Sequence, residues 1–171
     1  MNRIIALPAL LAAVVISLSG WCSPPKSGIE HIALFTRSTA QNPVYWARSW
    51  GVIRATGKLV PLSATDPNTA FLAVFPRGTY VVQPSTANTT QSGSVNPTTC
   101  WATTKITGAT YTDVAGSGTG IYKGLTGSGT YSILTIEKLP RLATGACNTS
   151  TDRVPGTFRS SVSGIGPISI P

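Results

Sequence analysis

The sequence predicts an all-β protein of about seven to nine strands, arranged as a sandwich or a barrel and preceded by a signal peptide and a short tether. Three observations predict it. Apolar side chains recur with a period of two along most of the chain. Threonine, glycine and β-branched residues, which favour strands and turns over helices, are frequent throughout, and turn signals recur at the spacing of a sandwich or barrel. Removing an expected leader of residues 1–19 from the 171 leaves 152, enough for one domain with a hydrophobic core.

The first residues have the pattern of a secretory leader. A short positive start, ending at Arg3, precedes the uncharged apolar run Ile4–Leu18. This run is shorter than the roughly 20 residues that span a bilayer, but it fits the apolar region of a signal peptide. Small residues at Ser17 and Ser19 predict cleavage after Ser19. We therefore expect the protein to be secreted or attached to the cell envelope.

Cys22 leaves three alternatives for the processed end. A cysteine followed by Ser-Pro-Pro resembles the lipidated start of a bacterial lipoprotein, although Trp21 stands where that motif has a small residue. Without lipid, the cleaved chain keeps a leftover thiol; without cleavage, Ile4–Leu18 remains as a membrane anchor. We expect residues 20–28 to be a disordered tether and residues 29–171 to form the barrel domain. Membrane contact is expected only through the leader or through lipid on Cys22.

Several stretches after the tether are predicted strands. They are Val52–Leu62, the hairpin Phe71–Val82 with its turn at Pro76-Arg77-Gly78, Thr99–Ile106, Ala109–Val114, Thr130–Leu139 and Thr157–Val162. Gly57 within the first of them predicts a bulge or bend. The only helical candidate is Asn42–Trp50, which has room for a turn or two. Asp66–Asn68 and the polar run Ser85–Asn96 are predicted loops, the second long enough to cross one mouth of a barrel.

The glycine-rich stretch Gly116–Ser132 raises the question of a phosphate site. It lacks the third glycine of the dinucleotide-binding pattern, because Ile121 stands there, and no Gly-Lys-Ser/Thr of a P-loop occurs in the chain. Neither motif has its strand-to-helix context here. Glycines allow positive φ and close approach of backbones. We interpret the stretch as a corner of the sheet between two strands.

The same stretch resembles the central signature of the allene oxide cyclase-like and dirigent-like barrels, and of secreted actinobacterial proteins of that type. The signature is carried by Gly116, Gly118, Thr119, Gly120, Tyr122, Gly124, Gly127 and Gly129. The hairpin Ala73–Val82 is similar to the Phe-Pro-x-Gly hairpin of the secreted proteins, and Thr99-Cys100 stands ahead of the signature as it does there. The resemblance implies an eight-stranded antiparallel barrel whose lumen is filled or holds a small apolar ligand. It transfers no activity.

The charge balance restricts the partners. Thirteen Lys and Arg against five Asp and Glu give a net charge of +8, with a pI near 9.9. The bases are scattered singly, whereas a nucleic-acid-binding protein concentrates them on one face. We therefore expect no nucleic-acid partner. Attraction to an anionic cell-envelope component or acidic polysaccharide suits an exported cation.

The cysteines predict a disulfide. With Cys22 at the processing boundary, Cys100 and Cys147 remain as a pair, and an oxidising compartment favours their bridging. The loop that they would close adds roughly 4 kcal/mol to stability by the chain-entropy estimate. A single histidine and the absence of Cys-x-x-Cys argue against a metal site, and no cofactor is expected.

No catalytic constellation is visible in the sequence. The sole histidine, His31, lies beside the tether, where a surface or strand position is expected, so Ser-His-Asp chemistry lacks its base. Of the five acidic residues, Asp66 and Asp152 suit turns or loops. We interpret Asp113 and Glu137 as ordinary surface groups on strands. The paired carboxylates of a glycoside hydrolase are therefore not expected.

Four side chains are candidates for lining a lumen: Arg54, Tyr80, Trp101 and Tyr122. The leading hypothesis is non-catalytic binding of a small apolar or envelope-derived ligand in that lumen. One alternative is a cyclase or isomerase, because a shaped apolar lumen can orient a reactive substrate with few polar groups. A second alternative is a structural protein that interacts with the cell envelope.

Overall fold

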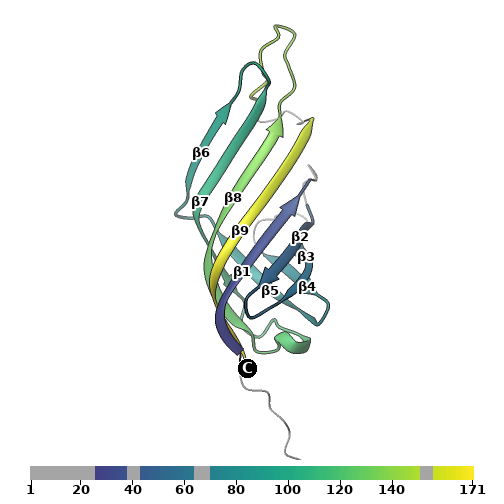
Figure 1. Ribbon diagram of the computed structural model, residues 1–171, viewed down its shortest axis with the longest axis vertical. Helices are drawn as coiled ribbons and strands as arrows, with labels where there is room; N and C mark the ends of the chain where they lie inside the picture. Colours follow the sequence, from purple (N-terminus) through teal and green to yellow (C-terminus); the bar gives the residue numbers. More distant parts are fainter. Residues whose placement is uncertain (1–25, 38–42, 64–69, 151–155) are drawn as a thin grey trace, which may run out of the picture.

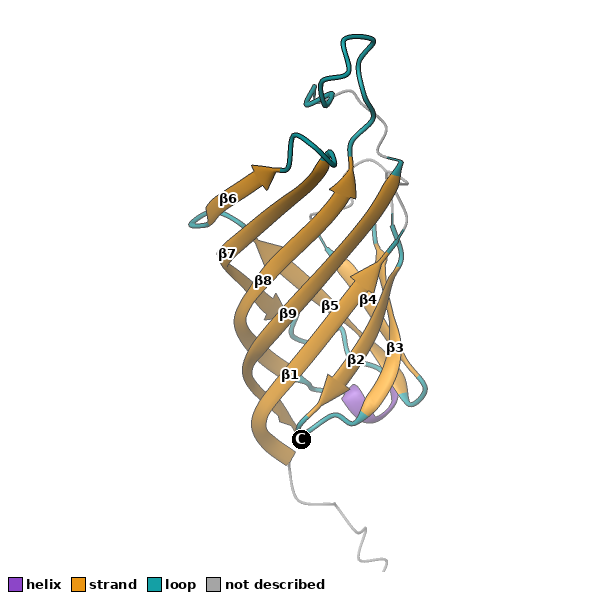
Figure 2. Ribbon diagram, turned by 45° about the horizontal axis from the view of Figure 1, so that its top comes forward, coloured by secondary structure: helices purple, strands orange, loops and turns teal. Residues whose placement is uncertain are grey.

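The chain folds into a closed antiparallel β-barrel (Figures 1 and 2). The computed structural model describes residues 26–37, 43–63, 70–150 and 156–171. Within them the elements are β1 (Lys26–Thr36), β2 (Tyr45–Trp50), β3 (Ala55–Pro61), β4 (Phe71–Phe75), β5 (Gly78–Ser85), β6 (Thr90–Val95), β7 (Trp101–Asp113), the short 3-10 turn η1 (Gly120–Tyr122), β8 (Thr126–Lys138) and β9 (Thr157–Ile170). All of these strands except β6 close the barrel. The predicted all-β fold with a barrel of about eight strands is confirmed.

The strands follow one another around the barrel in a simple order. From β1 to β5 each strand pairs with the next; β5 then pairs with β7, and β7, β8 and β9 continue until β9 meets β1. Every pair is antiparallel. The strands β7, β8 and β9 have 13, 13 and 14 residues. They extend past the shorter strands β2 to β5, so one wall rises above the rest of the barrel (Figure 1).

The long strand β7 has different partners along its length. Its first part pairs with β6 and its last part with β5. Its register against β8 shifts between Ile106 and Ala109, where Gly108 has a φ of +80°. This bulge joins the two separately predicted strands Thr99–Ile106 and Ala109–Val114 into one, because an extra residue bends a strand without ending it.

Two further elements correct the sequence-based expectations. The strand β6 lies within Ser85–Asn96, which was expected to be a loop; its residues are all exposed, and pairing with the edge of β7 makes them a strand. The segment Asn42–Trp50, the helical candidate, contains β2 instead. In β2, Ala47 and Ser49 are buried while their neighbours are exposed, which is the alternation of a strand.

The domain also begins earlier than expected. The residues Lys26, Ser27 and Gly28, predicted to belong to the tether, pair with the last residues of β9. The predicted signal peptide, its expected cleavage site and Cys22 lie outside the described residues. Inside β3, Gly57 pairs with Ala47 without a register shift, so the predicted bulge is absent. A Cβ at residue 57 would lie 2.7 Å from the Phe75 ring, and glycine makes room for that ring.

One end of the barrel is closed by the glycine-rich loop between β7 and β8. The turn η1 within it buries Tyr122, whose ring lies 6.1 Å from that of Phe75 and 5.5 Å from that of Tyr80. At Gly78, φ is +151° and a Cβ would lie 2.1 Å from the Thr119 carbonyl oxygen, so glycine permits the loop to dock. The stretch is therefore a corner between strands whose side chains plug the barrel.

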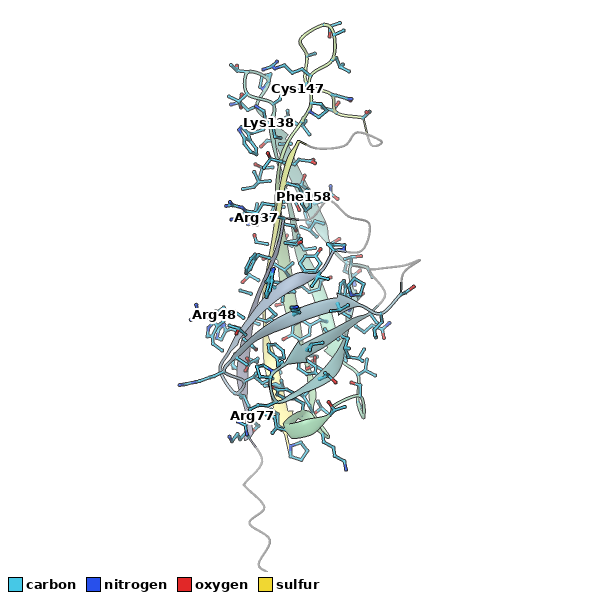
Figure 3. All side chains as sticks on the ribbon, turned by 90° about the vertical axis from the view of Figure 1, so that its right-hand side faces the viewer. Arg37, Arg48, Arg77, Lys138, Cys147 and Phe158 are labelled. Carbon is cyan, nitrogen blue, oxygen red and sulfur yellow. A yellow bond between two sulfur atoms is a disulfide. The ribbon has the colours of Figure 1, made fainter. Side chains whose placement is uncertain are left out.

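The disulfide lies at the opposite end. The sulfur atoms of Cys100 and Cys147 are bonded, with their Cα atoms 5.4 Å apart, which confirms the predicted pair. Figure 3 shows Cys147 and Lys138 at one end of the molecule and Arg77 at the other. A disulfide is compatible with an extracellular location. No helix in the described ranges is long and apolar enough to cross a membrane.

Candidate functional site

The interior of the barrel holds a cavity of about 350 Å³. Its walls are mainly apolar and include Ile32, Leu34, Leu59, Phe71, Val82, Ile133 and Val162. Alternation along each strand turns these side chains inward and their neighbours outward. The volume falls within the roughly 300–1,000 Å³ of small-molecule sites. The barrel thus encloses a ligand-sized space.

Polar side chains gather toward the closed end of this cavity. Glu30 comes from β1, Ser49 from the end of β2 and Tyr80 from the start of β5. Tyr111 and Asp113 come from the last residues of β7. The strand β7 ends at Asp113, immediately before the loop that plugs the barrel. The cavity therefore has apolar walls and a polar floor.

Glu30 is held by hydrogen bonds. The residue is 5% exposed, and its carboxylate accepts a hydrogen bond from the Ser49 hydroxyl on one oxygen. The other oxygen accepts a hydrogen bond of 2.8 Å from the backbone N–H of Ile53. Such bonds compensate a buried carboxylate for the water that it loses. They also fix the direction in which Glu30 faces the cavity.

Asp113 lacks this compensation. Its side chain is 6% exposed, and no residue in the described part of the chain donates a hydrogen bond to its carboxyl group or forms an ion pair with it. Burial, followed by the nearby charge of Glu30, raises the pKa of Asp113 to about 7. Asp113 therefore changes its charge near neutral pH inside the cavity.

Glycines of the signature make room for the floor. A Cβ at Gly127 would lie 2.4 Å from Oδ2 of Asp113, and a Cβ at Gly129 would lie 2.7 Å from the Tyr111 ring. Both glycines belong to β8 and follow the loop corner. The glycines of the signature thus serve two purposes. Those before β8 form the corner, and Gly127 and Gly129 within β8 let side chains of β7 lie across that strand.

The tyrosines of the cavity stay protonated near neutral pH. Burial, with the charges of Asp113 and Glu30, raises the pKa of Tyr80 well above 10. The same causes raise the pKa of Tyr111 to about 12. Burial also raises the pKa values of Tyr45 and Tyr131. Their hydroxyl groups are therefore neutral donors and acceptors. Among the described lining residues, the two carboxyl groups of Glu30 and Asp113 are the ones that bring charge.

The four lumen candidates lie in different places. Tyr80 lines the cavity. Tyr122 packs beneath it in the plug, against Tyr80. Arg54 is exposed outside the closed end, just before β3. Trp101 is 41% exposed on the outer face of β7, with the Lys138 ammonium 5.6 Å from its ring. Period-two alternation places Trp101 outside because Ala102 beside it points inward.

Sequence reasoning missed the two carboxylates of the floor. Glu30 was passed over, and Asp113 was interpreted as a surface group. The available signal was alternation: Glu30 stands two residues before Ile32, and Asp113 two after Tyr111, so each shares a face with inward-pointing groups. The sole histidine points elsewhere, because His31 stacks on Trp50 with ring centroids 5.4 Å apart.

The cavity is suited to binding and to proton transfer. Among the described residues no group of three or more His, Cys, Asp or Glu side chains could hold a metal ion. Asp113 can donate a proton when neutral and accept one when charged, as general acid–base chemistry near pH 7 requires.

Comparison of the chain with protein-family models, curated protein sequences and solved structures finds no match.

Proposed function

We propose that this protein binds a small, largely apolar molecule inside its barrel. The observation that carries the proposal is the cavity of about 350 Å³, which combines apolar walls with convergent polar groups at one end. This combination is the usual form of a small-molecule site. The resemblance to allene oxide cyclase-like and dirigent-like barrels, which implies a lumen that is filled or holds a small apolar ligand, is compatible with this proposal.

The experiment compares two variants of neighbouring residues on β8. Ile133→Trp would place an indole in the cavity, whereas Leu134→Trp would place it on the outer face, where Leu134 is 39% exposed. We expect the neutral fluorescent probe N-phenyl-1-naphthylamine to bind the wild type and Leu134→Trp equally, and Ile133→Trp at least about tenfold more weakly. Equal binding to both variants would place the probe outside the lumen and contradict the proposal.

A second candidate is a cyclase or isomerase in the same lumen. The observation that favours it is Asp113, a buried carboxyl group without a hydrogen-bond partner among the described residues and with a pKa of about 7. Native mass spectrometry of protein from its own host would identify a retained ligand. Saturable conversion of that ligand by the wild type, lost in Asp113→Asn, would establish catalysis. If the wild type binds the ligand without converting it, the candidate enzyme function fails and the proposed binding function stands.

A third candidate, contact with an anionic envelope surface, has its own support. Outside the closed end, the four bases Lys26, Arg54, Arg77 and Lys123 line one hollow. β1 begins at Lys26 at this end (Figure 1). We expect Arg54→Glu with Arg77→Glu to abolish sedimentation with phosphatidylglycerol vesicles at low salt. Lys105→Glu with Arg159→Glu, away from this hollow, is the matched control, and an equal loss there would contradict a specific surface.

Export and processing complete the proposal. The secretory pattern of residues 1–19 and the disulfide Cys100–Cys147 both suit a secreted or envelope-attached protein. Intact mass spectrometry would report the first residue of the mature chain and any lipid on Cys22. A full-length chain that remains in the cytoplasm with reduced cysteines would contradict export.

A further inference from the structure

The cavity carries negative charge without a positive partner. Glu30 and Asp113 both line it and are both more than nine-tenths buried. No lysine, arginine or histidine of the described residues lines it with them. Although the chain has thirteen Lys and Arg residues, the charged groups among the described lining residues are acidic. An acidic interior selects the charge of whatever enters it.

The two carboxylates differ in the hydrogen bonds that they accept. Glu30 already accepts hydrogen bonds from Ser49 and from the Ile53 N–H. Asp113 lines the same cavity but accepts none from the described residues. A buried carboxylate without donors is costly. A ligand that brings a charged donor to Asp113 would remove that cost and form a charge-assisted hydrogen bond.

The walls next to the floor favour an organic cation over a metal ion. Among the described residues, five aromatic rings line the cavity: Tyr45, Phe71, Tyr80, Tyr111 and Tyr131. Aromatic faces attract ammonium groups. A calcium ion, by contrast, requires six to eight oxygen ligands, and no group of three or more acidic or other metal-ligating side chains occurs in the described ranges. The lining therefore suits a positive group attached to an apolar body.

We propose that the ligand of the lumen is an apolar amine, with its ammonium group at Asp113 and Glu30 and its apolar body along the walls. This inference rests on the proposed binding function and names the chemical class of the ligand. The acidic floor would favour the amine over a neutral molecule of the same shape. It would also repel a carboxylate of that shape, because like charges would be brought together in a buried space.

The preference for an amine depends on pH. The titratable groups that face Asp113 are Glu30 on β1, Tyr80 on β5 and Tyr111 on its own strand, with Tyr45 on β2 and Tyr131 on β8 farther along the cavity. The tyrosines remain neutral near pH 7. Asp113 is the group that gains charge between pH 6 and 8, so amine affinity should rise over this interval while alcohol affinity stays constant.

The test uses three ligands of one shape: 4-phenylbutylamine, 4-phenylbutan-1-ol and 4-phenylbutyrate. Calorimetric titration of the mature protein at pH 8 should show the amine binding about tenfold or more tightly than the alcohol, and the carboxylate binding most weakly. Asp113→Asn should remove most of the amine preference while still binding the alcohol, which shows that the cavity is intact. Glu137→Gln, which alters an acid outside the cavity lining, should keep the preference.

The outcomes separate the two proposals. Equal affinity for amine and alcohol, tighter binding of the carboxylate, or an amine preference that persists in Asp113→Asn would each overturn the amine inference. Binding of N-phenyl-1-naphthylamine without binding of 4-phenylbutylamine would overturn it too, while leaving lumenal binding in place. If neither the naphthylamine probe nor any of the three ligands binds the wild type, the proposed function itself fails.

Discussion

The carboxylate of Asp113 lies across Gly127 on the neighbouring strand, so close that a Cβ at residue 127 would stand 2.4 Å from Oδ2. A Cβ does not approach a nonbonded oxygen this closely, so any other residue at position 127 would force the Asp113 carboxylate out of its place. The relationship connects a glycine of the sequence signature to a carboxylate of the cavity floor. It also identifies the substitution that would disturb the floor most directly.

Gly127→Ala should therefore destabilise the protein and weaken ligand binding. The added methyl group must displace the Asp113 carboxylate or separate β7 from β8, and overpacking of this kind costs about 1–3 kcal/mol. Urea unfolding measures the loss. The control is Gly156→Ala, because a Cβ there would meet only one atom within 4 Å, at 3.8 Å. Equal stability of the two variants would show that the floor has room that the structure does not indicate.

Asp113→Asn should change how stability depends on pH. The pKa of Asp113 is about 7 in the folded protein against 3.8 ordinarily, so between these values the folded state binds more protons than the unfolded state. Wild-type stability should therefore fall as pH rises through this interval, by up to about 4 kcal/mol from this group. The variant should lack this fall and be the more stable protein at pH 8.

Unfolding in urea at intervals from pH 4 to 8 measures this difference. The same series on Glu137→Gln provides the control, because that variant should retain the wild-type fall. If Asp113→Asn and the wild type show parallel pH dependence, Asp113 is charged throughout the interval, and its burial does not perturb its titration.

Tyr122→Ala should open the closed end of the barrel. Tyr122 is 1% exposed and contacts the rings of Phe75 and Tyr80. Truncation of a buried aromatic side chain costs about 3–5 kcal/mol. Its neighbour in η1, Ile121, is 41% exposed, and Ile121→Ala should change stability by less than about 0.5 kcal/mol. Thermal unfolding compares the two, and similar losses would mean that the plug does not depend on the Tyr122 ring.

Removal of the disulfide should lower stability without emptying the lumen. The bridge between Cys100 and Cys147 spans 47 residues of sequence, and its loss from the double serine variant should cost roughly 4 kcal/mol by the chain-entropy estimate. The bridge lies at the end away from Asp113, so the variant, where folded, should keep its affinity for the lumenal probe. Lost affinity at temperatures where the variant is folded would show coupling between the ends.

The sequence predicted the features that depend on local pattern. The hairpin of β4 and β5 follows from two apolar runs around Pro76 and Arg77, and β8 from alternation between Thr130 and Leu139. The disulfide followed from the number of cysteines. In each case the deciding information lies within a short segment or a simple count, so one sequence is sufficient.

Other strands escaped prediction because a neighbour decides them. The strand β6 has only exposed residues, so its composition does not predict a strand. Backbone pairing with the edge of β7 makes it one. The short aromatic segment of β2 looks helical by itself, but its position between β1 and β3 makes it a strand. Pairing between distant segments outweighed local propensity in both cases.

By itself the sequence determined an all-β fold, its glycine-rich corner and its disulfide, because alternation, turn residues and the number of cysteines are local features of the chain. Only the tertiary structure decided that Glu30 and Asp113, more than 80 residues apart, share one buried floor. Closure of the barrel brings β1 and the end of β7 to the same cavity, and that closure depends on the sum of all strand pairings. The chemistry of the site arises from this non-local geometry, since a carboxylate is an ordinary surface group until the fold removes its water.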